Sequence, residues 1–253
     1  MAWRKTYDGA EPQRVNKWLA QAGVCSRREA EELIARGKVS IDGKRVDDAG
    51  RKIAPGETLS LDGAEPLGTQ STYVLNKPVG VVSARPERAQ IPAARLLSRA
   101  DHWGAQEANR PPERDAKLAP LGRLDQDSRG LLLLSEDGVL AKAVIGPQSD
   151  MDKEYLVRVS GPVSAKALGL LRSGLSLDGR QLRPALVREV EDGRLKFVLR
   201  EGRKRQIRRM CSAVGLEVTD LFRVRIGPVA LGELPEGRWR ALTSEERAAM
   251  LKS

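Results

Sequence analysis

From residue 73 onwards the sequence consists mainly of short apolar segments separated by turn residues. The predicted strands lie at 73–75, 79–82, 131–134, 155–159, 185–190 and 196–200. The predicted helices are fewer and lie at about 139–145, 164–171 and 204–214. Strands and helices therefore do not alternate regularly. This pattern favours an α+β fold with a mixed, mainly antiparallel sheet over a doubly wound sheet.

The N-terminal region has a different pattern and predicts a separate small domain. Apolar residues at helical spacing indicate one helix at 14–22 and a second that begins near Ser26 and ends at Gly37. Strands are expected at 39–41 and 58–61, with Asp42-Gly43 as a hairpin turn. We therefore expect an α-α-β domain at 13–62, a linker at 63–72 and a larger domain at 73–253.

Composition limits the function of the chain. Its 253 residues carry 44 Lys and Arg against 34 Asp and Glu, and no apolar run approaches the roughly 20 residues of a membrane helix. The N-terminal residues are polar, so we expect a cytoplasmic protein without membrane attachment. One histidine and two cysteines are too few for a zinc site or a Ser/His/Asp triad, and there is no Gly-rich phosphate loop. We expect neither a metal nor a cofactor.

The positive charge is concentrated in one segment. Residues 196–225 contain nine basic and three acidic residues, and arginine outnumbers lysine there by seven to two. The planar guanidinium group suits phosphates and base edges. This composition therefore favours a nucleic-acid partner over a basic face that is merely solvated.

The predicted helix at 204–214 has two distinct faces. The apolar face carries, at the i, i+3, i+4, i+7 spacing, Ile207, Met210, Cys211 and Val214. The polar face carries Arg205, Arg208, Arg209 and Ser212. Cys211 is therefore predicted to be a core residue and not a nucleophile. Trp18 and Trp239 are likewise predicted to be core anchors, because aromatic residues do not interleave with the basic segment.

Four motifs stand in an order that resembles a known family. They are Asn76-Lys77-Pro78-Val79-Gly80, Gly122-Arg123-Leu124-Asp125-Gln126-Asp127-Ser128-Arg129-Gly130-Leu131-Leu132, Lys153-Glu154-Tyr155-Leu156-Val157 and Glu201-Gly202-Arg203-Lys204-Arg205-Gln206-Ile207-Arg208-Arg209-Met210. Together they resemble the ribosomal-RNA pseudouridine synthases of the RsuA/RluF group, and the RluF type most closely. The N-terminal module is similar to the small RNA-binding domain, like that of ribosomal protein S four, that many of these enzymes carry. The resemblance spans residues 13–243.

The resemblance implies an enzyme that isomerises one uridine of large-subunit (23S) ribosomal RNA to pseudouridine. The bond from ribose to N1 of the base breaks and the sugar is rejoined to C5, so no atom is gained or lost and no cofactor is required. Asp125 is implied as the catalytic carboxylate, acting on the sugar or the base or removing a ribose proton, and these routes stay open. Tyr155 is implied beside the uracil, and Arg208 as the basic partner of an ionised Asp125.

Further basic residues are expected to bind RNA. A stacked uridine must be extruded before it reacts, and the resemblance implies that Arg123 fills the vacated space. The other expected RNA-binding residues are Arg203, Lys204, Arg205 and Arg209 in the basic segment, and Arg14, Lys17, Arg27, Arg28, Lys38, Lys44 and Arg45 in the N-terminal module. We expect ribosomal RNA as the partner and a monomeric enzyme.

One segment departs from the family pattern. Residues 98–117 are longer and more polar than the resemblance implies, and they predict an exposed loop with the single histidine, His102, on the surface. The loop leads into the segment of Asp125 and is placed to affect substrate choice. Lys77 is left out of the catalytic set, and Asp127 is interpreted as a structural residue of a turn.

Three other interpretations are compatible with the sequence. A synthase acting on small-subunit ribosomal RNA would share this architecture. A non-catalytic RNA-binding or ribosome-assembly protein would retain the fold without using Asp125. A glycosidase or N-glycosylase would use Asp125 and Asp127 as an acid and base pair and would release free base. The joint presence of Asp125, Tyr155 and Arg208 favours the synthase.

Overall fold

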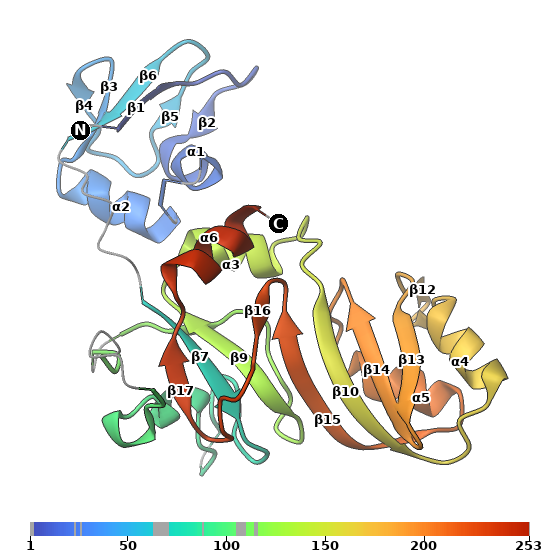
Figure 1. Cartoon of the computed structure of the whole chain (residues 1–253). Coiled ribbons are helices and arrows are strands. Elements are labelled where there is room, and N and C mark those ends of the chain that lie inside the picture. The colour runs from blue at the N-terminus through green and yellow to red at the C-terminus, as the bar shows by residue number, and fades with distance from the viewer. Residues whose placement is uncertain are drawn as a thin grey trace. The chain divides into compact units, whose positions relative to one another are not determined.

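The computed structural model describes residues 3–22, 24, 25, 27–62, 71–87, 89–104, 110–113 and 116–252. They form mainly two compact units, one within residues 3–62 and one from Ser71 onwards. Figure 1 shows the first unit in blue and the second in green to red. Of the predicted linker at 63–72, residues 63–70 lie outside the described residues.

The N-terminal unit combines two helices with a small antiparallel sheet. The helices are α1 (Val15–Gln21) and α2 (Arg27–Ala35), and the strands are β1 (Trp3–Thr6), β2 (Gln13–Arg14), β3 (Val39–Ile41), β4 (Lys44–Arg45), β5 (Lys52–Ile53) and β6 (Thr58–Leu61). The strand order is β1-β6-β3-β4, and β2 pairs with β5. The predicted hairpin turn is confirmed, since Asp42 and Gly43 have φ values of 48° and 77°. Strand β1 lies before residue 13, where the domain was expected to begin.

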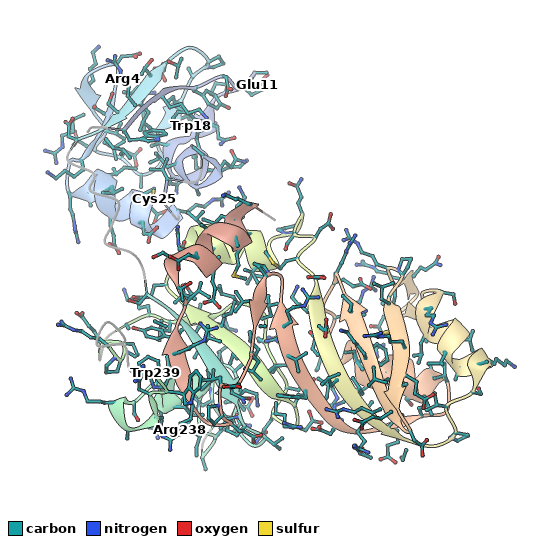
Figure 2. The ribbon with its side chains drawn as sticks, in the orientation of Figure 1. Arg4, Glu11, Trp18, Cys25, Arg238 and Trp239 are labelled. Carbon is teal, nitrogen blue, oxygen red and sulfur yellow. The ribbon has the colours of Figure 1, made fainter. Side chains whose placement is uncertain are left out.

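One apolar cluster forms the core of this unit. Val15, Trp18 and Leu19 of α1 are buried at the predicted helical spacing. The rings of Trp3 and Tyr7 lie edge-on to Trp18, with centroids 5.8 Å and 5.5 Å away. Trp18 is therefore confirmed as a core residue, and it is labelled in Figure 2. Ser26, near which the second helix was expected to begin, lies outside the described residues.

The second unit is built on a large mixed sheet. Its strands are β7 (Thr72–Lys77), β8 (Ala119–Pro120), β9 (Arg129–Ser135), β10 (Lys153–Ser160), β13 (Leu186–Glu191), β14 (Arg194–Leu199), β15 (Glu217–Ile226), β16 (Val229–Ala230) and β17 (Trp239–Ala241). The order is β13-β14-β10-β15-β9-β7-β17, with β16 beside β15 and β8 beside β9. A separate small pair is formed by β11 (Ser176–Leu177) and β12 (Arg180–Gln181). The predicted α+β fold is confirmed.

Strands β9 and β15 are parallel, whereas the other described pairs of this sheet are antiparallel. Where these two strands meet, Arg129 pairs with Phe222, and Gly130 pairs with Arg223. Gly130 has a φ of 107°, and a methyl group on it would collide with the carbonyl oxygen of Arg223. Glycine is therefore required here for the two strands to approach each other.

Helices cover both faces of the sheet. They are α3 (Gly138–Ile145), α4 (Ala165–Arg172), α5 (Gln206–Ala213) and α6 (Ser244–Lys252), with short 3₁₀ helices at Ala93–Leu96 and Arg99–Asp101. Leu131 and Leu133 of β9 share an apolar cluster with α3 and α6. Leu132 and Leu134 point to the opposite face and share a cluster with α4 and α5. In the described part of the chain, no helix has the length and apolarity needed to cross a membrane.

The predicted strand at 79–82 is wrong. These residues turn back after β7, and only Val82 forms a strand-like bridge, to Pro92. The reason is the buried amine of Lys77, which donates hydrogen bonds to the carbonyl oxygens of Pro78 and Val81 at 2.7 Å and 2.8 Å. A chain folded around this amine cannot extend into a strand.

The predicted helix at 204–214 is shorter than expected. Arg205 has a left-handed φ of 51°, so α5 begins at Gln206 and ends at Ala213. Ile207, Met210 and Cys211 are buried, which confirms the predicted apolar face and the core position of Cys211. Arg205 stands before the helix and is therefore not part of its polar face.

The expectation that His102 lies on the surface is wrong. His102 is half-buried, and its ring centroid lies 4.9 Å from that of Trp239. Trp239 is fully buried, which confirms it as a core anchor, and its Nε1 donates to the carbonyl oxygen of Ser98 at 2.7 Å. Part of the predicted loop at 98–117 is therefore packed against β17, while 105–109, 114 and 115 lie outside the described residues.

Candidate active site

The Asp125 segment, residues 122–128, connects β8 with β9 and is fixed by the loop that follows β7. The Ser83 hydroxyl donates to the carbonyl oxygen of Leu124 at 2.7 Å, and the Leu124 N–H donates back to this hydroxyl at 2.9 Å. The Gly80 N–H donates to the carbonyl oxygen of Gln126 at 2.8 Å. The backbone on both sides of Asp125 is therefore held in place by the segment that follows β7.

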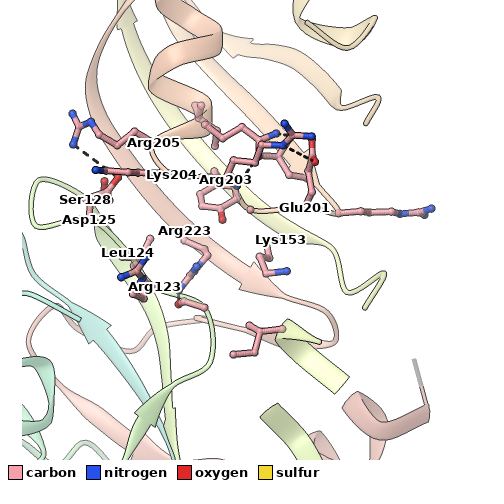
Figure 3. Close-up of a pocket in the computed structure, with 18 of the residues that line it drawn as sticks. Arg123, Leu124, Asp125, Ser128, Lys153, Glu201, Arg203, Lys204, Arg205 and Arg223 are labelled. Atoms are coloured by element: carbon pink, nitrogen blue, oxygen red, sulfur yellow. Dashed lines mark hydrogen bonds and ion pairs between the residues drawn. The ribbon is translucent and has the colours of Figure 1, made fainter. Parts of the chain in front are cut away.

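Asp125 and Tyr155 line the same pocket, which has a volume of about 470 Å³. Figure 3 shows the position of Asp125 in this pocket. Tyr155 projects from β10 and is 8% exposed, whereas the Asp125 side chain is 40% exposed. Residues 199–207 supply a further wall. The pocket therefore brings together two of the three residues predicted to be catalytic.

Arg205 is the arginine that lies beside Asp125. Its Nη1 is 3.9 Å from an oxygen of the Asp125 carboxylate. Its two terminal nitrogens also donate to the two carboxylate oxygens of Asp127, at 3.2 Å and 2.9 Å. This forked geometry holds the guanidinium between the two aspartates.

Arg208 does not occupy the position expected for it. Its Nε lies 3.3 Å from Asp127 Oδ2, and its terminal nitrogens donate to the carbonyl oxygens of Val218 and Asp127 at 3.1 Å and 2.8 Å. Among the described residues no ion pair joins Arg208 to Asp125. The expected pairing is therefore corrected: Arg208, in the first turn of α5, reaches the turn at 127–128 instead.

The Asp127 carboxylate accepts two hydrogen bonds from Arg205 and forms an ion pair with Arg208. Partial burial acts to raise the pKa of Asp127, but the hydrogen bond from Arg205 and the charge of Arg208 outweigh it, so this pKa lies below its usual value. The carboxylate is thus ionised at neutral pH. Asp127 was interpreted as a structural residue. In the structure its carboxylate holds two guanidinium groups, those of Arg205 and Arg208, next to the pocket.

Two buried cations also line the pocket, and neither was among the predicted site residues. Arg223 of β15 is 1% exposed, and it donates to the carbonyl oxygens of Leu131 and Gly122 at 2.7 Å and 3.0 Å. Lys153 of β10 is 8% exposed and donates to the carbonyl oxygen of Met151 at 2.9 Å. Burial, together with the charge of Arg223, lowers the pKa of Lys153 to about 8.

Lys153 could have been found from the strand periodicity. It shares a face of β10 with Tyr155 and Val157, so it is a lysine on an otherwise apolar face. The sequence pattern around Arg223 does not indicate that this residue is buried, because its burial depends on the pairing of β15 with β9 and β10.

The remaining basic residues of the large unit divide into paired and unpaired groups. Arg123 and Lys204 are not buried, line the pocket and have no ion pair with any described residue. Arg203 also lines the pocket but lies 3.4 Å from Glu201, and Arg209 pairs with Asp178 at 2.6 Å. Arg123 and Lys204 therefore have charges available for a ligand.

The N-terminal unit leaves the basic residues predicted to bind RNA outside its core. They are Arg14, Lys17, Arg27, Lys38, Lys44 and Arg45. Arg45 pairs with Asp47 at 2.8 Å, and nothing is described of the Arg28 side chain. RNA contact by these residues stays a prediction.

Within the described residues, we find neither a cluster of metal ligands nor an exposed cysteine. In the described ranges, no group of three or more His, Cys, Asp or Glu side chains could hold a metal ion. Burial raises the pKa of Cys211 to about 12, and burial with the charge of Glu29 does the same for Cys25. Neither thiol is therefore a nucleophile at neutral pH.

The chain matches two protein-family models. Residues 71–213 match the RNA pseudouridylate synthase family, and residues 13–59 match the S4 domain. A solved structure described as a pseudouridylate synthase resembles the whole chain, with a TM-score of 0.65 and 27% sequence identity. The match covers 95% of this chain and 100% of that one.

Curated relatives match over nearly the whole chain. The dual-specificity RNA pseudouridine synthase RluF of Escherichia coli K12 is 33% identical over 243 residues, which are 94% of this chain and 78% of the relative. The ribosomal large subunit pseudouridine synthase B of Bacillus subtilis is 35% identical over 241 residues, covering 92% of this chain and 93% of the relative. An uncharacterized RNA pseudouridine synthase of Aquifex aeolicus is 35% identical over 248 residues, covering 95% and 94% respectively.

Proposed function

The chain belongs to the RNA pseudouridylate synthase family, and from this premise we propose that it isomerises a specific uridine of large-subunit ribosomal RNA to pseudouridine. The observation that supports this most directly is that Asp125 and Tyr155 line one pocket whose other walls are rich in basic side chains. The name of the Bacillus subtilis relative supports the large subunit over the small one.

We assign Asp125 as the catalytic carboxylate. Of the two acidic residues that line the pocket, Glu201 accepts hydrogen bonds from the Arg183 N–H and from the Gln206 amide, whereas Asp125 has one long contact of 3.9 Å, to Arg205. Tyr155 is assigned to contact the uracil and to assist transfer of the C5 proton. Arg208 becomes a positioning residue that acts through the turn at 127–128, and Arg205 supplies the positive charge beside Asp125. Arg123 is assigned to the space left by the extruded base.

The geometry favours an isomerase over a glycosidase. A glycosidase would need Asp127 or Asp125 as a proton donor with a raised pKa. The pKa of Asp127 is instead lowered, and its carboxylate is engaged by Arg205 and Arg208. Asp127 is therefore a poor general acid at neutral pH.

The N-terminal S4 domain supports an RNA partner, and we propose that its lysines and arginines bind the phosphate backbone. We further propose that the enzyme acts as a monomer in the cytoplasm. Sedimentation of the purified protein measures the oligomeric state, and a stable dimer would contradict the monomer.

Asp125→Asn tests the chemical assignment. We expect the rate of pseudouridine formation in ribosomal RNA to fall by about 100- to 10 000-fold, because the amide cannot act as nucleophile or base. The dissociation constant for the RNA should stay nearly unchanged. Asp178→Asn is the matched control, since Asp178 is an exposed aspartate that pairs with Arg209. Retained activity of Asp125→Asn would refute the assignment, and release of free uracil by the wild type would identify a glycosidase.

The target is tested by mapping pseudouridine along both ribosomal RNAs from a strain that lacks this protein. We expect one or more pseudouridines to be missing from the large-subunit RNA and restored by the wild-type chain. Missing sites only in the small-subunit RNA would establish the small-subunit alternative. An unchanged map in both RNAs would favour a non-catalytic binding protein.

A further inference from the structure

We propose that Lys153 and Arg223 form an anion-binding site in the pocket that holds the uracil ring while it is detached from the ribose. The proposal rests on the proposed function, because it concerns an intermediate of that reaction. It assigns a chemical role to two residues that were not among the predicted site residues.

These two buried cations form no direct ion pair with any described carboxylate. Within the described residues, no carboxylate oxygen lies within 4 Å of the Lys153 Nζ or of a guanidinium nitrogen of Arg223, and Asp152, whose charge acts on Lys153, forms its ion pair with Arg225. Taking two positive charges out of water without an acidic partner is unfavourable. Burial lowers the pKa of Lys153 to about 8, and an anion bound in the pocket would raise it again. The missing negative charge is therefore expected to come from a ligand.

Both residues also have hydrogen-bond donors to spare. The guanidinium of Arg223 uses Nε and Nη2 for the carbonyl oxygens of Leu131 and Gly122, and it has five N–H donors. The amine of Lys153 has three donors and uses one for Met151. The backbone carbonyls fix the orientation of both groups, and the remaining donors are available to oxygen atoms of a ligand.

The two cations lie beside the two residues assigned to the chemistry. Arg223 is the cross-strand neighbour of Tyr155, so their side chains share one face of the sheet. Lys153 lies two residues before Tyr155 on the same face of β10. A methyl group on Gly122 would be 3.8 Å from Nη1 of Arg223 and 3.9 Å from Cε of Lys153. Both cations therefore lie against the start of the Asp125 segment (Figure 3).

The reaction produces an anion that fits this site. When the bond between C1′ and N1 breaks, its electron pair leaves with the base, and the negative charge spreads over N1, O2 and O4. The electron deficiency left at C1′ is compensated by the Asp125 carboxylate until C5 forms its bond there. The ring then turns, C5 forms its bond to C1′, the C5 proton is lost and N1 gains a proton, so the atoms balance. Negative charge on the base exists only between the breaking of the first bond and the formation of the second. Donors that meet it stabilise the detached state more than the bound uridine and therefore accelerate the reaction.

A phosphate of the RNA backbone fits this site less well. Arg223 and Lys153 are almost completely buried, so only a group inserted deeply into the pocket can reach them. Arg123 and Lys204 line the same pocket, are not buried and are unpaired within the described residues, so they are better placed for a backbone phosphate.

The test is Lys153→Met in the full-length protein, which removes the charge and keeps a side chain of similar length. The control is Lys196→Met, which makes the same charge change in the neighbouring strand β14 at a lysine that pairs with Glu154 and does not line the pocket. The measurements are the single-turnover rate of pseudouridine formation and the dissociation constant for the target RNA. Thermal unfolding checks that each variant is folded, and Lys153→Gln replaces Lys153→Met if the latter is not.

We expect Lys153→Met to lower the single-turnover rate by about 100-fold, the usual effect of removing one donor from a pre-formed anion site, with RNA affinity unchanged. Lys196→Met should have the wild-type rate. Equal rates for the two variants would overturn the proposal while leaving the proposed function intact. A weaker dissociation constant with an unchanged rate would also overturn it, because that result identifies a phosphate contact. If the wild type forms no pseudouridine, both the proposed function and this inference fail.

Discussion

Asp127 and Asp125 are separated by one residue, yet their surroundings differ. Arg205 and Arg208 both engage the Asp127 carboxylate, whereas Asp125 has a single long contact of 3.9 Å, to Arg205. Asp127 therefore holds Arg205 beside Asp125 without a close ion pair between Arg205 and Asp125. The oxygens of Asp125 are left available for a substrate within a positively charged pocket.

Asp127→Asn tests this division of roles. We expect the single-turnover rate to fall by about 10- to 100-fold, because Arg205 is no longer held beside Asp125. Stability at pH 7 should fall by about 0.2–1 kcal/mol, the range of partly exposed ion pairs. This difference from the wild type should vanish as the pH falls through the lowered pKa of Asp127, because a protonated carboxyl group loses the same ion pairs.

The matched control for this substitution is Asp178→Asn, which removes another two-point pair, with Arg209 of α5. Its rate should equal that of the wild type. Activity is measured under single-turnover conditions, and stability by urea unfolding across the acidic range from pH 7 downwards. Equal effects of the two substitutions on the rate would show that Asp127 has no particular role at the pocket.

At the level of the elements, the parallel contact of β9 with β15 builds the pocket. It places Arg223 next to Gly130 and allows the Arg223 guanidinium to bond the carbonyl oxygens of Leu131 and Gly122. The Asp125 segment leads directly into β9, so this contact joins the proposed catalytic carboxylate to the buried cations. The absence of a side chain at Gly130 is what permits it.

Gly130→Ala is therefore expected to affect both stability and activity. The methyl group would collide with the backbone of Arg223 at a φ of 107°, and we expect a decrease of about 3 kcal/mol in the free energy of unfolding. Pseudouridine formation should fall as well, because Arg223 is displaced. Denaturant unfolding and the single-turnover rate are the measurements.

Gly232→Ala is the control for backbone conformation alone. Gly232 has a φ of 58° and nothing within 4 Å of the added methyl group, so we expect the free energy of unfolding to fall by only about 1–2 kcal/mol and the rate to stay unchanged. If both variants are destabilised equally, the close approach of β9 and β15 does not depend on glycine.

At the scale of the whole molecule, the two units have separate cores, and the residues proposed for RNA binding and for the chemistry are divided between them. The N-terminal unit has its own apolar cluster and basic side chains outside it. The larger unit has the pocket with Asp125, Tyr155 and the buried cations. We expect the first unit to contribute RNA affinity and the second to contribute the chemistry.

Deletion of residues 1–62 tests this separation. We expect weaker RNA binding and a shallower dependence of the logarithm of affinity on the logarithm of salt concentration, by about 0.7 for each phosphate of single-stranded RNA that is no longer neutralised. The single-turnover rate at saturating RNA should remain close to that of the full chain. Circular dichroism and thermal unfolding establish that the remaining unit is folded. An unchanged salt dependence would show that the N-terminal unit binds no phosphates.

Local sequence was sufficient for much of this protein. The amphipathic helices, the Asp42-Gly43 hairpin and the alternating strand at 155–159 depend on neighbours a few residues away, so their patterns predicted them. The prediction of a strand at 79–82 was wrong because the chain bends around the buried Lys77 amine. The spacing of apolar residues does not reveal such a bend. Strand β15 was missed because it includes a buried arginine, and that burial follows from pairing with β9 and β10.

The same distinction applies to the candidate site. The motifs named Asp125 and Tyr155, and long-range pairing places them in one pocket. The backbone conformation decides which arginine lies beside Asp125. Arg205, which precedes α5, has a left-handed conformation and lies there, whereas Arg208 reaches the turn at 127–128. Lys153 and Arg223 lie in one pocket only because β10 and β15 are neighbouring strands. Residue chemistry is thus encoded locally, whereas the combination of charges at the pocket depends on strand pairings between distant parts of the chain.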